Sequence, residues 1–158
     1  MNSQSRQVTR YPYDLDVGPA PAANQAQRVL VADDTVEMRR LIAAVLRKDG
    51  YEVDELSDGL ELLAAIEAVG KQPEQSIAMI ISDIRMPGLT GLDLLAILRC
   101  ASWSTPVILI TAFGDDLTHD QAYELGATAV FDKPFEMDEL RAAVHEVVPP
   151  SRLAQRPQ

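Results

Sequence analysis

Five short apolar segments recur along this chain, and a longer segment with helical periodicity follows each one. The apolar segments are residues 28–32, 51–56, 77–81, 106–110 and 129–131. Short strands that are joined by helices pair in parallel, and a parallel sheet is covered by helices on both faces. The alternation therefore predicts an α/β fold with one parallel sheet at its centre.

The segments between the predicted strands have apolar residues at the spacing of one helix face. In the first of them, apolar residues recur every three or four positions from Met38 to Leu46, and Gly50 marks the helix end. The first two helices are predicted to begin after Thr35 and after Asp58. The other three are predicted to span residues 91–101, 117–125 and 136–148. The fourth helix has a thin apolar face, so it is expected to be held loosely.

The second apolar segment, residues 51–56, differs from the others because it alternates apolar and polar residues. Such a strand has one face in water, which predicts a place at the edge of the sheet. An edge position suits the doubly wound strand order 2-1-3-4-5, the flavodoxin-like arrangement. In that order the first and third strands are neighbours, and their carboxyl ends meet where ligands bind in open α/β sheets.

Three carboxylates follow these two neighbouring strands. Asp33 and Asp34 come directly after the first strand, and Asp83 follows the third. Three negative charges in one crevice repel one another, which raises pKa values and costs stability. Bound Mg²⁺ or Mn²⁺, which prefers oxygen ligands, would offset the repulsion, and Lys133 at the end of the fifth strand would add a fixed positive charge.

This set of residues predicts phosphoryl chemistry. Mg²⁺ usually binds through one or two carboxylates together with a phosphate. Asp83 is the expected nucleophile and would form an aspartyl phosphate, while the hydroxyl of Thr111 at the end of the fourth strand would donate to a phosphoryl oxygen. Each residue taken alone is commonly structural, for example paired Asp as a helix cap or Lys-Pro as a loop. Their joint placement at four strand ends supports the prediction.

Several motifs around these residues resemble those of a known family. They are Val29-Leu30-Val31-Ala32-Asp33-Asp34, Ile81-Ser82-Asp83-Ile84-Arg85-Met86-Pro87-Gly88, Gly91-Leu92-Asp93, Ile110-Thr111-Ala112-Phe113-Gly114-Asp115, and Gly126-Ala127 running to Lys133-Pro134-Phe135. Over about residues 28–148 the chain resembles the receiver domain of two-component response regulators, the class of the chemotaxis regulator. The resemblance implies that a histidine kinase or a histidine phosphotransfer protein donates phosphate to Asp83 in the presence of Mg²⁺.

The resemblance also implies a role for each residue of the site. Asp34, Asp83 and the backbone carbonyl of Arg85 would hold the metal, with Asp33 acting through water. Thr111 and Lys133 would bind the phosphoryl oxygens, as the phosphoryl-binding and switch residues.

One position departs from the family pattern. In the family, the threonine moves toward the phosphate and an aromatic ring three residues before the lysine turns inward. Here that position is Val130, and Phe131 follows it. A valine cannot respond by a ring flip, so the usual coupling is not expected here. The resemblance also links phosphoryl lifetime to the positions two after the acceptor and two after the threonine, which are Arg85 and Phe113.

Composition sets further expectations. Residues 1–27 are rich in Ala, Pro, Gln, Asn and Ser and are predicted to be a disordered N-terminal tail, and residues 149–158 a C-terminal tail. Residues 28–148 carry 22 acidic and 10 basic side chains, which argues against nucleic-acid binding. No apolar run reaches the roughly 18 residues of a membrane span. The single cysteine suits a cytoplasmic protein.

Three other residues with reactive side chains are expected to be structural. Cys100 is predicted to be a small apolar filler near the end of the third helix. His119 and His145 have no second ligand at a fitting spacing, so neither is predicted to bind a metal.

Only ten residues follow position 148, which is too few for an output domain. The predicted function is therefore a stand-alone response regulator that signals through protein–protein contacts of its fourth helix, fifth strand and fifth helix. Two alternatives stay open: a phosphorelay shuttle, and a phosphorylation-independent scaffold whose switch has decayed at Val130. A phosphatase needs an Asp-x-Asp pattern after the first strand, which the chain lacks, so no enzyme activity is expected.

Overall fold

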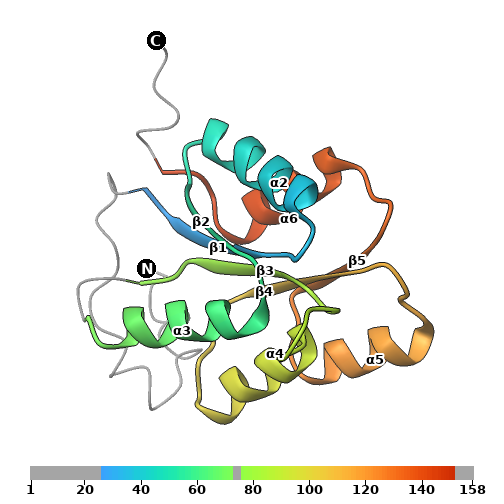
Figure 1. The fold of residues 1–158 in the computed structure, drawn as a ribbon. Helices are drawn as coiled ribbons and strands as arrows, with labels where there is room; N and C mark the ends of the chain where they lie inside the picture. The colour runs from blue at the N-terminus through green and yellow to red at the C-terminus, as the bar shows by residue number, and fades with distance from the viewer. Residues whose placement is uncertain (1–25, 73–75, 152–158) are drawn as a thin grey trace, which may run out of the picture.

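The computed structural model describes residues 26–72 and 76–151, and within these ranges five parallel strands alternate with five helices (Figure 1). The strands are β1 Arg28–Ala32, β2 Glu52–Leu56, β3 Met79–Asp83, β4 Val107–Thr111 and β5 Ala129–Asp132. The helices are α2 Val36–Lys48, α3 Gly59–Gly70, α4 Gly91–Cys100, α5 Asp116–Glu124 and α6 Met137–Val147. The sheet has the order β2-β1-β3-β4-β5, which confirms the predicted fold and strand order.

Helices cover both faces of the sheet, with α2 and α6 on one side and α3, α4 and α5 on the other (Figure 1). Successive strand residues point to opposite faces. Leu30, Ile80 and Leu109 lie in the core beneath α3, α4 and α5. Val31 and Ile81 lie in the opposite core, against α2 and α6. β1, β3 and β4 are apolar at most positions because both of their faces are buried.

The register of the sheet positions the carboxylates. Ala32 on β1 pairs with Ser82 on β3, so the residues that follow them, Asp33 and Asp83, lie at the same level. β3 begins at Met79, two residues later than predicted, and Asp83 is its last residue. β2 lies at the sheet edge, as the alternating pattern predicted.

Short polar side chains start three of the helices. Asp58 accepts a hydrogen bond from the backbone of Glu61, and Asp115 accepts one from the backbone of Thr118. Thr90 starts α4 in the same way. Thr35 lies at the cap position of α2, but its side chain makes no capping hydrogen bond.

The two helices beside β5 are buried to different extents. Ala122 is the buried residue of α5, and Leu117 is 75% exposed, which agrees with the thin apolar face predicted for this helix. In contrast, α6 buries Leu140 and Val144. Cys100 is exposed at the end of α4, so its prediction as a core filler was wrong.

The predicted tails lie almost wholly outside the described residues, apart from short stretches next to the domain. Of these, the carbonyl of Gln27 accepts a hydrogen bond from the backbone of Glu52 at 2.9 Å, and Ser151 is buried. The domain boundaries remain predictions. Among the helices of residues 26–72 and 76–151, none has the length and apolar character to cross a membrane.

Candidate functional site

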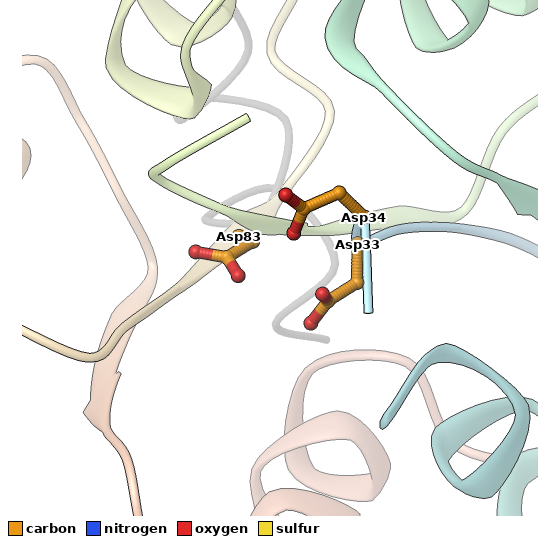
Figure 2. Close-up of side chains that lie close together, drawn as sticks. All are labelled: Asp33, Asp34 and Asp83. Carbon is orange, nitrogen blue, oxygen red and sulfur yellow. The ribbon is translucent and has the colours of Figure 1, made fainter. Parts of the chain in front are cut away.

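The three predicted carboxylates come together at the carboxyl edge of the sheet. Asp33 and Asp34 follow β1, Asp83 ends β3, and one oxygen from each lies within 4.8 Å of the others (Figure 2). Asp33 and Asp83 are 1% and 5% exposed, whereas Asp34 is exposed to solvent. The cluster therefore has two buried members and one that faces water.

Lys133 supplies the positive charge of the site. Its Nζ atom lies 2.9 Å from Oδ2 of Asp83 and 3.4 Å from Oδ2 of Asp33. Lys133 follows β5, and its backbone N–H donates to the carbonyl of Thr111 at 2.8 Å. The end of β5 is thereby fixed to the end of β4, and the lysine side chain reaches the carboxylates.

Backbone N–H groups orient the two buried carboxylates. The N–H of Thr35 donates to Oδ1 of Asp33 at 2.8 Å, and the N–H of Arg85 donates to Oδ1 of Asp83 at 3.1 Å. Each carboxylate therefore has one oxygen directed at the backbone and the other directed at Lys133.

Burial and the neighbouring charges shift the pKa values of two groups in the site. Burial raises the pKa of Asp33, and the negative charge of Asp83 raises it further, although the backbone of Thr35 and the charge of Lys133 oppose the shift. Burial alone would lower the pKa of Lys133, but its hydrogen bond to Asp83 and the charge of Asp33 outweigh that effect, so the pKa is raised. Lys133 is therefore protonated at neutral pH.

The donor set fits a hard divalent cation. All three side chains offer carboxylate oxygens, the ligands that Mg²⁺ prefers, and the cluster contains neither His nor Cys. One lysine leaves a deficit of positive charge beside three carboxylates. Asp34 adds a solvent-facing oxygen at which a hydrated cation can enter. The role of the Arg85 carbonyl as a metal ligand stays a prediction.

Thr111 ends β4 at the same edge and is 1% exposed. Its Oγ1 atom accepts a hydrogen bond from the backbone N–H of Phe113 at 3.1 Å, which leaves the hydroxyl proton for another acceptor. The guanidinium of Arg85 lies 4.6 Å from the centre of the Phe113 ring. Phosphoryl binding by Thr111 and Lys133 stays a prediction, and so does any effect of Arg85 and Phe113 on phosphoryl lifetime.

Val130 and Phe131 point to opposite faces of β5. Val130 packs against the core on the α3, α4 and α5 side. Phe131 packs on the α2 and α6 side, with its ring centre 5.7 Å from that of Phe135. Phe131 therefore cannot stand in for the aromatic ring that Val130 replaces.

Both histidines contact carboxylates, which the sequence did not indicate. His119 Nε2 lies 2.9 Å from Oδ1 of Asp132, and His145 Nε2 lies 2.8 Å from Oδ2 of Asp49. The partners are separated by 13 and 96 residues in the chain, and no spacing rule connects them. Neither histidine belongs to the cluster of possible metal ligands found among the described residues.

Comparison with known families gives one match that covers most of the chain. The family model described as "Response regulator receiver domain" matches residues 29–145. The matched residues include the three carboxylates of the site, Asp33, Asp34 and Asp83, together with Thr111 and Lys133.

Individual relatives agree with the family match. The chain is 31% identical over 123 residues to sporulation initiation phosphotransferase F of Bacillus subtilis, which covers 78% of this chain and 94% of that protein. It is also 31% identical to the transcriptional regulatory protein CpxR homolog of Haemophilus influenzae, but spans only 50% of its length. The chain thus spans about half of several longer regulators.

Solved structures show the same fold. The chemotaxis protein CheY4 of Vibrio cholerae superposes with a TM-score of 0.69 at 28% identity, over 78% of this chain and 100% of that one. A response regulator receiver domain protein from Clostridium thermocellum gives a TM-score of 0.69 at 29% identity, over 77% of this chain and 94% of that one.

Proposed function

The chain belongs to the response regulator receiver domain family, and on that premise we propose that Asp83 accepts a phosphoryl group from a phosphohistidine on a histidine kinase or phosphotransfer protein. The observation that carries the proposal is the placement of Asp83. It is an almost buried carboxylate, 2.9 Å from a charged lysine and within a cluster of three carboxylates that suits Mg²⁺.

The proposed transfer is a displacement at phosphorus. An oxygen of the Asp83 carboxylate forms a bond to phosphorus while the phosphorus–nitrogen bond of the donor breaks. The donor nitrogen keeps the electron pair of that bond and takes up a proton, which regenerates the imidazole. Mg²⁺ or Mn²⁺, when bound through Asp33, Asp34 and Asp83, offsets negative charge on the carboxylates and the phosphoryl oxygens.

Lys133 and Thr111 complete the site in this proposal. Lys133 already contacts Asp83, and its raised pKa keeps it charged beside the oxygens that gain negative charge. The Thr111 oxygen accepts from the N–H of Phe113, a bond that does not use the hydroxyl proton, so the hydroxyl can donate to a phosphoryl oxygen. Both residues are held in place by the backbone hydrogen bond from Lys133 to Thr111.

We propose further that the receiver signals through its own surface, made of α5, β5 and α6, to a protein partner. The loose hold on α5 supports this, since a helix with few buried side chains moves at low cost. The excess of acidic side chains argues for a protein partner and against nucleic acid. The proposed location is the cytoplasm, where ATP-dependent kinases phosphorylate histidine.

A phosphorelay shuttle is the second candidate. The chain spans 94% of the length of a relative that is named a phosphotransferase. This similarity favours a protein that passes its phosphoryl group on. The two candidates differ in one measurable property. A phosphorylated shuttle transfers its phosphoryl group to a histidine phosphotransfer protein. A phosphorylated regulator instead binds a target protein, and the target does not become phosphorylated.

The test is intact-mass measurement after incubation with acetyl phosphate and Mg²⁺. We expect a gain of one phosphoryl group in the wild type, and no gain after chelation of the metal or in Asp83→Asn. Asp120→Asn, which changes an exposed aspartate of α5, is the matched control and should gain the group. Failure of the wild type to accept phosphate from acetyl phosphate and from a phosphohistidine donor would overturn the proposal and favour the scaffold.

A further inference from the structure

The segment between β4 and α5, residues 112–115, lies between the phosphoryl site and α5. Two contacts hold its site-facing side. The N–H of Phe113 donates to Oγ1 of Thr111 at 3.1 Å, and the guanidinium of Arg85 lies over the ring of Phe113. A change in the position of the Thr111 hydroxyl therefore acts directly on this segment.

Within this segment, the backbone at Gly114 lies close to three side chains. A Cβ atom at Gly114 would lie 2.1 Å from Oδ1 of Asp132 and 2.8 Å from Nε2 of His119. It would also lie 2.6 Å from Cγ2 of Thr111. Real Cβ contacts are almost never this short, so the backbone at Gly114 passes directly against Thr111, His119 and Asp132, and even a methyl group does not fit.

His119 and Asp132 are themselves in contact, with Nε2 and Oδ1 2.9 Å apart. His119 belongs to α5, which otherwise buries only Ala122 among its own residues, and Asp132 ends β5. In the sheet, Asp132 is the register partner of Thr111. It also precedes Lys133, whose N–H donates to the Thr111 carbonyl at 2.8 Å.

From these contacts we propose that His119 and Asp132 are positioning residues that couple the phosphoryl site to α5. This inference rests on the proposed function. When the Thr111 hydroxyl turns toward a phosphoryl oxygen, residues 112–115 shift with it. Gly114 then displaces the His119–Asp132 contact, and α5 loses its polar attachment to β5. This coupling replaces the one that Val130 cannot supply.

The test is hydrogen exchange of the amides of residues 119–124 in α5, with and without beryllofluoride and Mg²⁺ as the phosphoryl mimic. In the wild type we expect the mimic to raise α5 exchange by about fivefold, the effect of losing one hydrogen bond. His119→Ala should show about that exchange rate without the mimic, and the mimic should then add less than twofold. Intact mass should show that the variant still accepts a phosphoryl group.

The chain offers a matched control. His145 makes a similar contact, 2.8 Å from a carboxylate oxygen of Asp49, but on α6. His145→Ala should leave the α5 response to the mimic unchanged. His119→Gln, whose amide can still donate to Asp132, should restore part of the response. A merely structural role for His119 would not produce this rescue together with loss of the response in His119→Ala.

A second variant tests the same contact with both partners present. Gly114→Ala places a methyl group against Asp132, Thr111 and His119, so it should raise α5 exchange without the mimic. A wild-type response to the mimic in His119→Ala would overturn the coupling. So would unchanged α5 exchange in a wild type that mass measurement shows to be phosphorylated on Asp83. Absence of any phosphoryl gain in the wild type is a different result and overturns the proposed function as well.

Discussion

The helices α5 and α6 lie on opposite faces of the sheet next to β5, yet they are held in different ways (Figure 1). α6 buries Leu140 and Val144 completely, whereas α5 buries Ala122 and leaves Leu117 mostly exposed. Burial of a leucine side chain contributes roughly 2 kcal/mol more than leaving it exposed. The apolar contribution to stability is therefore much larger on the α6 side.

The polar contacts follow the same division. Asp49 at the end of α2 accepts from Arg141 Nε at 3.0 Å and lies 2.8 Å from His145, both on α6. The hydroxyl of Tyr51 donates to the carbonyl of Val148 just beyond α6. α6 is thus joined to α2 and to the start of β2, while α5 is joined to β5 through His119. Under the proposed coupling, a shift at β5 would therefore displace α5 at a lower cost than α6.

The largest change in the free energy of unfolding is expected where α6 packs on the sheet. Leu140→Ala should lower the free energy of unfolding by about 2 to 5 kcal/mol, because it leaves a cavity in the core between α6 and the sheet. Leu117→Ala on α5 should change it by less than about 0.5 kcal/mol, because the side chain is exposed. Urea unfolding of the two variants measures both values. Equal losses would show that α5 is as firmly packed as α6.

A smaller effect is expected from the polar link of α6. Asp49→Ala should cost about 1 to 2 kcal/mol, since it removes charged hydrogen bonds whose partners are partly exposed. Although burial opposes the shift, the hydrogen bonds from Arg141 and His145 lower the pKa of Asp49 below 3.8. Its contribution is therefore present above pH 3.8 and is lost as the pH falls through the lowered pKa.

Unfolding measured between pH 6 and pH 2 tests this second prediction. The difference in stability between the wild type and Asp49→Ala should shrink as the pH falls. A difference that stays constant down to pH 2 would mean that the Asp49 carboxylate is not the source of the stability. The α5 exchange rate should not change in the variant, because the side-chain hydrogen bonds of Asp49 are to Arg141 and His145 on α6.

The smallest expected effect concerns Tyr51. Tyr51→Phe should cost about 1 kcal/mol, the contribution of its hydrogen bond to the Val148 carbonyl. Burial, with a further contribution from the charge of Asp49, raises the pKa of Tyr51 from 10.0 to about 12. The wild type should therefore lose stability as the pH rises from 10 to about 12, since the unfolded chain ionises first. If Tyr51→Phe loses stability equally over that range, another group is responsible.

Much of this fold can be predicted from the sequence because burial leaves a periodic pattern. The strands are apolar at both faces, β2 alternates because it lies at an edge, and α5 has few apolar residues because little of it is buried. The acidic cluster was predictable for a related reason. Parallel strands end at one edge, so Asp33 and Asp83 had to meet once the strand order was known.

The polar contacts between elements could not be predicted in this way. His119 and Asp132 meet beside the backbone of Gly114, and Arg141 meets Asp49 from 92 residues away. Such pairs depend on the polar sides of the helices and on the paths of the loops, whereas apolar periodicity identifies only the helix face that packs on the sheet. Cys100 was misjudged for the same reason, since a residue at a helix end can lie on either side of the apolar face.

The contacts of Lys133 have a consequence for the newly made protein. The lysine lies 50 residues after Asp83 and 100 residues after Asp33, so the ribosome has finished most of the domain before the site can close. A nascent or truncated chain carries the aspartate but has neither the lysine nor the fifth strand that aims it. Under the proposed function, a chain can therefore accept a phosphoryl group on a complete site only after residue 133 has been added.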